Sequence, residues 1–437
     1  MLMCKISDLC DVVKGVTSIQ KASPGIYPLV VTAEDRLSSD EYQFDCKAVC
    51  IPLVSSTGHG HASIKRIHYQ EGKFALGSIL AAVISKDENV LDTKYLYTYL
   101  SFFKDSILVP LMKGSANVSL TVKSLMSAEI IVPSIYKQRS IINTVESLKV
   151  KFDKIYLKLY EQDKNINELR QAILQQAVEG KLVPQYPNDE PANVLLAKIA
   201  EEKERLIKEG KIKKEKLFPP ISEDEIPYEL PNGWEWAYIN EIAFVTKLAG
   251  FEYTKYLSTA ISNSGEVPIV RAQNIKMNRF IDSSAEFISF ELSEKLNRSA
   301  LYKKCVLMTF IGAGIGEVSI FNRNKRYHLA PNVAKVEIFN NFSLNIDEKY
   351  LLYYLMSATG QREIFGFLKA TAQPSLSMET IRKIRVPIPP LQEQMRIIEK
   401  VDQLMSLCDK LEKNIEQSKN DSELLMQSVL QKAFKKE

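Results

Sequence analysis

Two long stretches of the chain place apolar residues at alternating steps of four and three. Residues 138–179 and 391–437 contain no glycine or proline that would interrupt a helix. A heptad pattern held over this length is typical of a coiled coil, and each apolar stripe needs a partner. We therefore predict that the two helices pack on each other, with polar Gln162 and Ser418 at equivalent seam positions fixing the register. The two seams are Ile141, Val145, Leu148, Phe152, Ile155, Leu159, Gln162, Ile166, Leu169 and Ile173, and Ile397, Val401, Leu404, Cys408, Leu411, Ile415, Ser418, Ser422, Leu425 and Val429.

The chain also contains an internal repeat that includes both helices. Segment 119–179 aligns without gaps on segment 375–435, so that Pro133 falls on Pro389 and Gln138 on Gln394. Repeats of this length are too long for a solenoid and indicate a tandem duplication of a globular part followed by a helix. If a two-fold axis relates the copies, the two helices run antiparallel.

The globular parts combine strand-like and helix-like patterns. Short apolar runs rich in β-branched residues predict strands, and amphipathic stretches predict helices. The predicted fold class is therefore α/β: two mixed α/β domains separated by two long antiparallel coiled-coil helices, with a pseudo-two-fold internal repeat. The predicted strands are 29–31, 48–54, 79–84, 269–270, 306–310 and 333–338, and the predicted helices are 94–103, 193–210 and 349–356.

Changes in composition mark the borders of these parts. Gly180 ends the first long helix, as glycine commonly does one position past a helix end. A run of charges and prolines follows, typical of a solvated linker, before Pro231-Asn-Gly-Trp234 starts a second folded part. The predicted order is a first α/β domain at 1–136, a central helical region at 137–182, a charged linker at 183–230, a second α/β domain at 231–390 and a distal helical region at 391–437.

The composition excludes several classes of protein. There are 57 Lys and Arg against 53 Asp and Glu, a net charge of +4, and 45% of the residues are hydrophobic. These values are ordinary for a globular protein and argue against a disordered chain or a simple basic DNA-coating protein. No apolar run is long enough to cross a membrane, so we expect no membrane partner. The six scattered cysteines favour a reducing cytoplasm.

One group of residue types could in principle bind zinc. Cys46 and Cys50 are followed by His59 and His61, which are all possible zinc ligands. However, the cysteine spacing is not a usual zinc-binding spacing and no second cysteine pair follows. We expect no metal here and interpret both cysteines as small buried residues.

Motifs for catalysis are absent from the sequence. There is no GxxxxGK[ST] phosphate loop, no HExxH and no GxSxG. The stretch Gly312-Ala-Gly-Ile-Gly316 lacks dinucleotide-binding spacing and predicts a tight turn with exposed backbone next to a ligand. Its counterpart in the first repeat is Gly58-His-Gly60. The duplicated halves are therefore predicted to be recognition modules, not an enzyme.

Duplex DNA is an extended target that suits two similar modules. Near one strand the second repeat has Arg271-Ala-Gln-Asn274-Ile-Lys276, where the first has Val31-Thr-Ala-Glu34-Asp-Arg36. Arg, Gln and Asn can pair with base edges, and Lys and Arg can contact phosphates. Loops that differ on a shared scaffold predict two different half-sites. The candidate DNA-contacting residues are Ser56, Thr57, His59, His61, Lys65, Arg66, Lys113, Arg271, Gln273, Asn274, Lys276, Thr309, Arg323, Lys325, Arg326 and Lys369.

Several stretches of this chain resemble the specificity (S) subunit of type I restriction–modification systems. The similar stretches are Leu169 to Leu182 at the end of the first helix, Leu230-Pro-Asn-Gly-Trp234, Ser375-Leu376, and Pro389-Pro-Leu-Gln-Glu-Gln394 before the second helix. The resemblance covers the whole chain in order. One departure is that the first domain begins at Met1 without a counterpart of the Trp234 segment.

The resemblance carries expectations about function. It implies two target recognition domains that each read half of a bipartite, asymmetric double-stranded DNA site. It also implies that the helical regions set the half-site separation and bind methyltransferase (M) subunits, and that a restriction and translocation (R) subunit joins the complex. S-adenosylmethionine, ATP and Mg are expected on those partner subunits, and no cofactor is expected in this chain.

Two other functions are compatible with parts of the sequence. A coiled-coil protein-interaction adaptor could use the same repeats without DNA specificity. A self-contained restriction enzyme would need methyltransferase and nuclease motifs, which the sequence lacks.

Overall fold

The computed structural model describes residues 2–57, 60–115, 117–215, 218–339, 346–366 and 375–435. They divide into two compact units: unit 1 comprises Met1–Glu161 and Ile415–Glu437, and unit 2 comprises Gln162–Asn414. The two long helices are α4 (Ile135–Val178) and α12 (Leu391–Lys435). Each is divided between the two units, with one portion in unit 1 and the other in unit 2. No helix within the described ranges is both long and apolar enough to cross a membrane.

Unit 1 contains two four-stranded sheets and a two-stranded ribbon. The sheets have the strand orders β2-β9-β6-β7 and β4-β3-β8-β5, and the ribbon pairs β1 with β10. The strands are β1 (Leu2–Lys5), β2 (Cys10–Lys14), β3 (Tyr27–Val30), β4 (Leu37–Ser39), β5 (Phe44–Asp45), β6 (Ala48–Pro52), β7 (His68–Gln70), β8 (Lys73–Leu76), β9 (Leu80–Ser85) and β10 (Glu129–Val132). The shorter helices are α1 (Ile6–Leu9), α2 (Thr93–Ile107), η1 (Val109–Leu111) and α3 (Val122–Met126).

Unit 2 repeats this arrangement. Its sheets have the orders β12-β21-β18-β19 and β16-β13-β20-β17, its ribbon pairs β11 with β22, and a further small sheet pairs β14 with β15. The strands are β11 (Glu235–Tyr238), β12 (Ala243–Lys247), β13 (Val267–Val270), β14 (Ile275–Lys276), β15 (Arg279–Phe280), β16 (Phe287–Ile288), β17 (Ala300–Leu301), β18 (Cys305–Thr309), β19 (Val318–Phe321), β20 (Tyr327–Leu329), β21 (Val333–Ile338) and β22 (Arg385–Ile388). The shorter helices are α5 (Ala192–Lys208), η2 (Glu223–Glu225), α6 (Ile239–Ile242), α7 (Gly250–Glu252), η3 (Tyr253–Leu257), η4 (Ala272–Asn274), α8 (Phe290–Lys295), η5 (Asn297–Ser299), α9 (Glu348–Met356), α10 (Ala358–Gly366) and α11 (Met378–Arg382).

The matching strand orders confirm the internal duplication and the predicted fold class. Even the parallel pair is repeated, because β3 lies parallel to β8 in unit 1 and β13 lies parallel to β20 in unit 2. The predicted strands correspond to β3, β6, β9, β13, β18 and β21, and the predicted helices correspond to α2, α5 and α9.

Equivalent polar residues start equivalent helices in the two units. Asp92 caps α2 by accepting a hydrogen bond from the backbone N–H of Lys94 at 2.8 Å, and Asp347 caps α9 through Lys349 at the same distance. Side-chain oxygens at this position satisfy backbone donors that have no partner inside the helix. The repeated sequence therefore sets the start of α2, which covers the β2-β9-β6-β7 sheet, and of α9, which covers the β12-β21-β18-β19 sheet.

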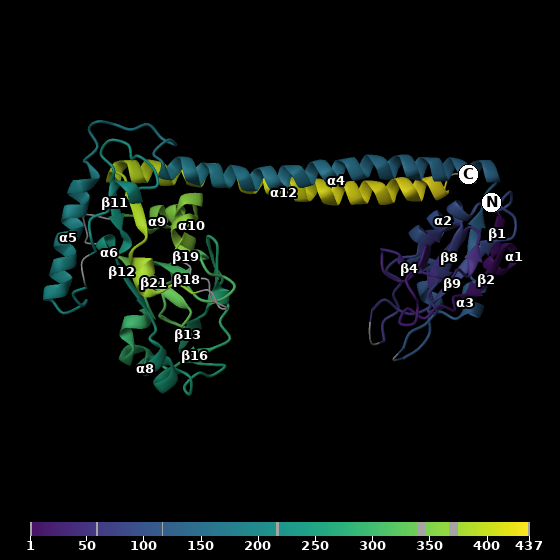
Figure 1. Cartoon of the computed structure of the whole chain (residues 1–437), viewed down its shortest axis with the longest axis horizontal. Helices are drawn as coiled ribbons and strands as arrows, with labels where there is room; N and C mark the ends of the chain where they lie inside the picture. Colours follow the sequence, from purple (N-terminus) through teal and green to yellow (C-terminus); the bar gives the residue numbers. More distant parts are fainter. Residues whose placement is uncertain are drawn as a thin grey trace. The chain divides into compact units, whose positions relative to one another are not determined.

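The C-terminal end of α12 completes the core of unit 1. Phe434 packs against Tyr95 and Tyr99 of α2 with ring centroids 6.1 and 5.5 Å apart, and against Phe102 and Phe103 at 5.8 and 5.5 Å. Aromatic rings in this range contribute packing beyond the area they bury. Figure 1 shows the yellow end of α12 beside α2.

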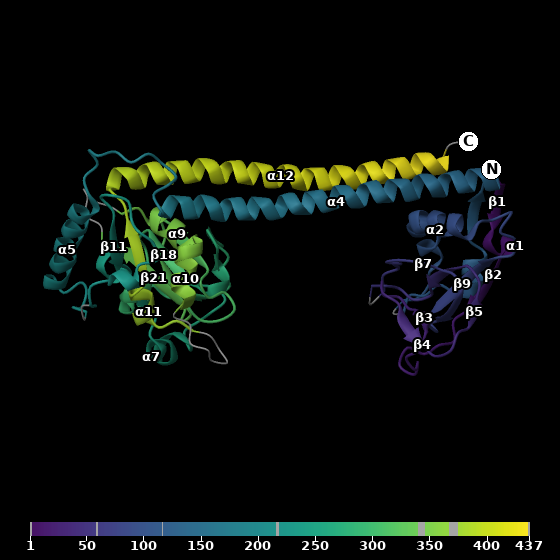
Figure 2. The same cartoon turned by 45° about the horizontal axis from the view of Figure 1, so that its top comes forward.

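Within each unit α4 and α12 pack side by side and run in opposite directions (Figures 1 and 2). In unit 1 the hydroxyl of Tyr156 donates to Glu423 at 3.3 Å. In unit 2 the guanidinium of Arg170 donates to Asp409 at 2.6 Å and to Glu412 at 3.1 Å. Lower residue numbers in α4 thus meet higher numbers in α12, which confirms the antiparallel prediction.

The burial of the seam differs from the expectation. The positions that recur every seven residues are buried from Phe152 to Ile173 and from Val401 to Ile415. The alternate position is exposed at Ile155 (39%), Leu169 (46%) and Leu411 (47%), and it is buried at Ile141 and Ile397 near the start of each helix. Gln162 and Ser418 are exposed as well, so neither is a buried polar residue of the seam, and their effect on the register stays a prediction. Away from the start of each helix the buried stripe is therefore narrow, and the second stripe is largely exposed. The buried seam residues are Ile141, Phe152, Leu159, Ile166, Ile173, Ile397, Val401, Cys408 and Ile415.

Candidate nucleic-acid interface

Two loops lie side by side at one end of the β2-β9-β6-β7 sheet in unit 1. Val54 and Lys113 each form a bridge to Ser119, and the backbone N–H of Ser55 donates to the carbonyl of Val118 at 3.0 Å. These contacts join residues 54–57 to residues 113, 118 and 119. Candidate residues from two separate parts of the sequence therefore meet on one surface.

The hydroxyl groups of Ser56 and Thr57 form hydrogen bonds with backbone groups of the same loop. Thr57 Oγ1 donates to the carbonyl of His61 at 3.2 Å, and the backbone N–H of Lys65 donates to Ser56 Oγ at 2.8 Å. The side chains of His61, Lys65 and Lys113 are exposed. Ser56 and Thr57 hold the loop, while the imidazole and the two ammonium groups are directed at solvent and can meet phosphates.

Unit 2 repeats this pairing at its glycine-rich turn. Ile311 forms a bridge to Ser375, equivalent to the bridge between Val54 and Ser119 in unit 1. Gly312 has a φ of +101° and Gly316 a φ of +84°, a backbone region that favours glycine. No atom lies within 4 Å of the position where a Cβ of Gly312 would stand. The prediction of a tight turn is confirmed, and the expectation that its backbone lies next to a ligand stays a prediction.

Three basic residues of unit 2 that are predicted to contact DNA form ion pairs with carboxylates. Arg271 contacts Glu286 at 2.6 Å, Lys276 contacts Glu317 at 3.1 Å and Arg323 contacts Asp282 at 2.8 Å. In unit 1 the same holds for Arg66, which contacts Glu34 at 2.9 Å. A phosphate would have to compete with these carboxylates, so each such residue adds less to DNA affinity than a free cation would.

Two candidate DNA-contacting residues are buried, and the prediction is corrected for them. Asn274 is 3% exposed; its side-chain oxygen accepts from the N–H of Arg271 at 2.9 Å, and its amide donates to Ile281 and Ser283 at 3.0 and 2.9 Å. Thr309 is 0% exposed inside β18. Neither side chain can reach a base without loss of the fold around it.

Arg326 is also removed from the candidates. Its guanidinium contacts Glu294 at 2.6 Å and donates to Ser293 and Asn297 at 2.8 and 2.7 Å, so its hydrogen-bonding groups serve the fold of unit 2. Gln273 remains exposed, and the exposed Lys325 ammonium lies 5.1 Å from the ring centre of Tyr327. His59 and Lys369 lie outside the described residues.

Arg279, an exposed arginine on β15, is not among the DNA-contacting residues predicted from the sequence. It lies in a segment too short to show a strand pattern, and the sequence gives no signal that distinguishes it from other surface arginines. The described part of the chain makes no ion pair or hydrogen bond with its guanidinium.

The cysteines weighed as zinc ligands lie in apolar surroundings. Burial raises the pKa of the Cys50 thiol to about 12, and burial also raises the pKa of Cys46. A thiol that resists deprotonation is a poor metal ligand. His61 is exposed on the loop described above.

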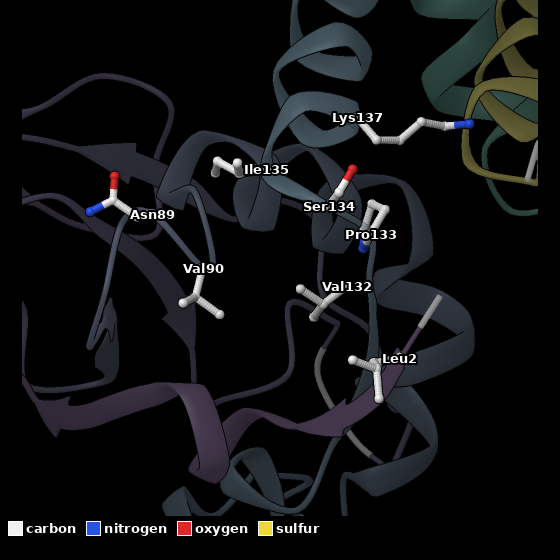
Figure 3. A pocket seen from close by; sticks show the side chains of 8 residues that line it. All are labelled: Leu2, Asn89, Val90, Val132, Pro133, Ser134, Ile135 and Lys137. Atoms are coloured by element: carbon white, nitrogen blue, oxygen red, sulfur yellow. The ribbon is translucent and has the colours of Figure 1, made fainter.

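A shallow cavity of about 610 Å³ opens near the start of α4 in unit 1 (Figure 3). Its lining is largely apolar, and it lies beside the β1–β10 ribbon. At the equivalent ribbon of unit 2, the buried indole of Trp234 donates its N–H to Glu393 at 3.0 Å. The lining residues are Leu2, Asn89, Val90, Val132, Pro133, Ser134, Ile135 and Lys137.

Comparison with known proteins gives a consistent result. Residues 2–162 and 231–418 match the family described as "Type I restriction modification DNA specificity domain". The Type I restriction enzyme EcoAI and EcoEI specificity subunits of Escherichia coli are 34% and 32% identical over 278 and 276 residues. Each alignment covers 61% of this chain. It covers only 44% of the EcoAI subunit and 43% of the EcoEI subunit, so this chain spans less than half the length of each relative.

Solved structures support the fold. A chain from a structure of the type I R-M system has a TM-score of 0.65 at 14% identity, covering 99% of this chain and 97% of that one. The HsdS subunit from Thermoanaerobacter tengcongensis has a TM-score of 0.52, also at 14% identity, covering 99% and 96%.

Proposed function

Because the chain belongs to the type I restriction modification DNA specificity domain family, we propose that it is the specificity subunit of a type I restriction–modification complex. In this function unit 1 and unit 2 each read one half of a bipartite duplex site. The observation that carries the proposal is the repeated pair of loops on an identical strand order, with different residues in the two copies. A shared scaffold with divergent loops suits two half-sites of different sequence.

We further propose that methyltransferase and restriction subunits bind this chain and supply the chemistry. S-adenosylmethionine, ATP and Mg would bind to those subunits, and this chain would be non-catalytic. Support comes from apolar side chains that the long helices leave exposed, because such side chains favour contact with a protein partner. On α4 they include Val150, Leu157 and Tyr160, and on α12 they include Leu407 and Leu424.

A selection from random duplexes tests the proposal. The full chain, co-expressed with a methyltransferase subunit, is incubated with a library of random double-stranded DNA, and the bound fraction is sequenced. We expect one bipartite motif with two specific halves and a spacer of fixed length. A bound fraction that shows no base preference would contradict the function.

The salt dependence separates DNA binding from the adaptor alternative. Lys65 and Lys113 are exposed and form no ion pair within the described ranges. Each phosphate contact contributes about −0.9 to the slope of log K against log[salt]. Replacing both by alanine should therefore reduce the slope by about 2 and weaken binding equally on all sequences, whereas an adaptor would show no such linear dependence.

A further inference from the structure

Unit 2 carries a hairpin that unit 1 lacks. The strands β14 and β15 lie between β13 and β16, in the connection 271–286. The equivalent connection of unit 1, between β3 and β4, consists only of residues 31–36. The hairpin is thus an insertion at the same point of the scaffold where the two copies already differ in sequence.

The hairpin is anchored in unit 2 both at its strands and at its turn. Ile275 is fully buried, and the ring of Phe280 packs edge-on against Phe321 with centroids 5.5 Å apart. The N–H of Asn278 donates to the carbonyl of Val318 on β19 at 2.9 Å. A segment held this way loses little conformational entropy when it binds a ligand.

The tip of the hairpin is compact and exposed. Lys276 and Arg279 are directly opposite each other, which leaves Met277 and Asn278 as the two-residue turn. Asn278 has a φ of +59°, a conformation that asparagine tolerates better than most residues. Met277 is 40% exposed, so the turn presents an apolar side chain, an amide and a guanidinium to solvent.

The charges on the hairpin point to an anionic ligand. Side chains directly opposite on antiparallel strands share a face, and like charges there are destabilising. Glu317 neutralises Lys276 at 3.1 Å, but no carboxylate within the described ranges neutralises Arg279. This differs from Arg271, Arg323 and Arg326, which all contact carboxylates. Arg279 is therefore an exposed cation on an anchored hairpin, with no carboxylate partner within the described ranges.

We propose that the β14–β15 hairpin enters the major groove of the DNA and that Arg279 reads a guanine in the half-site of unit 2. The inference rests on the proposed function and names the residue that determines part of its specificity. The major groove of B-DNA admits a two-stranded β-ribbon, and arginine forms two parallel hydrogen bonds with O6 and N7 of guanine. Met277 at the tip is placed to contact a thymine methyl group.

The experiment compares Arg279→Ala, Arg279→Lys and a control, Lys303→Ala. Lys303 is an exposed cation of the same unit that contacts Glu337 at 3.4 Å and lies outside the candidate interface. Each full-length variant is co-expressed with the methyltransferase subunit and used to select from the random duplex library. A lost bidentate arginine contact reduces discrimination at one base pair by about 10-fold.

We expect Arg279→Ala to relax a single guanine position in one half-site and to leave the other half-site unchanged. Arg279→Lys keeps the charge but lacks the planar fork that matches O6 and N7, so it should recover affinity while the base preference stays weaker than in the wild type. Lys303→Ala should behave like the wild type.

Two results would overturn the inference alone. In one, Arg279→Ala keeps every base preference of the wild type. In the other, it weakens binding equally on all sequences and lowers the salt slope, as a phosphate contact would. If the wild-type complex itself shows no base preference, the proposed function fails, which is a separate result.

Discussion

Asn274 shows how a side chain suited to reading bases can serve the fold instead. Its buried amide joins the N–H of Arg271 to the carbonyls of Ile281 and Ser283, so it ties the start of the hairpin to its end. Its neighbour Gln273 has the same amide chemistry but is exposed. The amide that can contact DNA and the amide that cannot are adjacent in the sequence.

Asn274→Ala should therefore lower the stability of unit 2, and Gln273→Ala should not. The alanine leaves three backbone groups without their partner, which costs about 1–3 kcal/mol. Thermal unfolding measures the difference, with Gln273→Ala as the matched control. Equal midpoints for the two variants would show that the amide does not hold the hairpin.

Two buried histidines should make the protein sensitive to acid. Burial lowers the pKa of His328 to about 4, helped by the charges of Arg326 and Lys335, and burial with the charge of Arg36 does the same for His68. Both pKa values lie below that of an unfolded histidine, so the unfolded chain binds more protons in this range. The contribution to stability is complete above about pH 6.5 and is lost as the pH falls towards about 4.

The double variant His68→Gln/His328→Gln tests this origin of acid sensitivity. Its unfolding midpoint should fall less steeply than that of the wild type between pH 6.5 and 4, even if it is lower at pH 7. Parallel curves for the two proteins would exclude the histidines as the cause.

At the scale of elements, long patterns were predictable from the sequence, whereas several strands of only two residues were not. The heptads of α4 and α12 and the apolar runs of β6, β9 and β21 gave elements close to those observed. The strands β14 and β15 have two residues each, so no periodicity can reveal them. Ion pairs such as Arg271 with Glu286 depend on tertiary contacts, so the sequence could not show which cations are already neutralised.

Two leucines of α4 provide a matched test of the helix packing. Leu159 is 8% exposed and Leu157 is 65% exposed, although both lie on the same helix in unit 1. Leu159→Ala should cost about 2 kcal/mol or more, because it removes buried contacts, whereas Leu157→Ala should change stability by less than about 0.5 kcal/mol. Denaturant unfolding measures both values. Similar losses would contradict the burial of Leu159 and the exposure of Leu157.

Leu157→Ala also addresses the proposed partner surface. If the exposed apolar side chains of the long helices contact a methyltransferase subunit, this variant should weaken assembly without lowering stability. Co-purification with that subunit, measured beside Leu159→Ala, separates the two effects.

At the scale of the whole molecule, the net charge of +4 has a clearer meaning. Several basic residues of both units form ion pairs within the fold. The net charge therefore does not show which basic residues remain unpaired or where they lie. Lys65 and Lys113 lie on the paired loops of unit 1 and Arg279 on the hairpin of unit 2. A chain that reads bases with a few residues does not need a large excess of positive charge.

The central claim is that one chain reads two different half-sites with two copies of one scaffold. The most direct measurement is single-molecule sequencing of methylated bases in cells that express this chain with its methyltransferase subunit. The account predicts one bipartite motif, with two unlike specific halves separated by a spacer of constant length and unspecified sequence. Methylation of a single uninterrupted motif, or methylation without any shared motif, would contradict it.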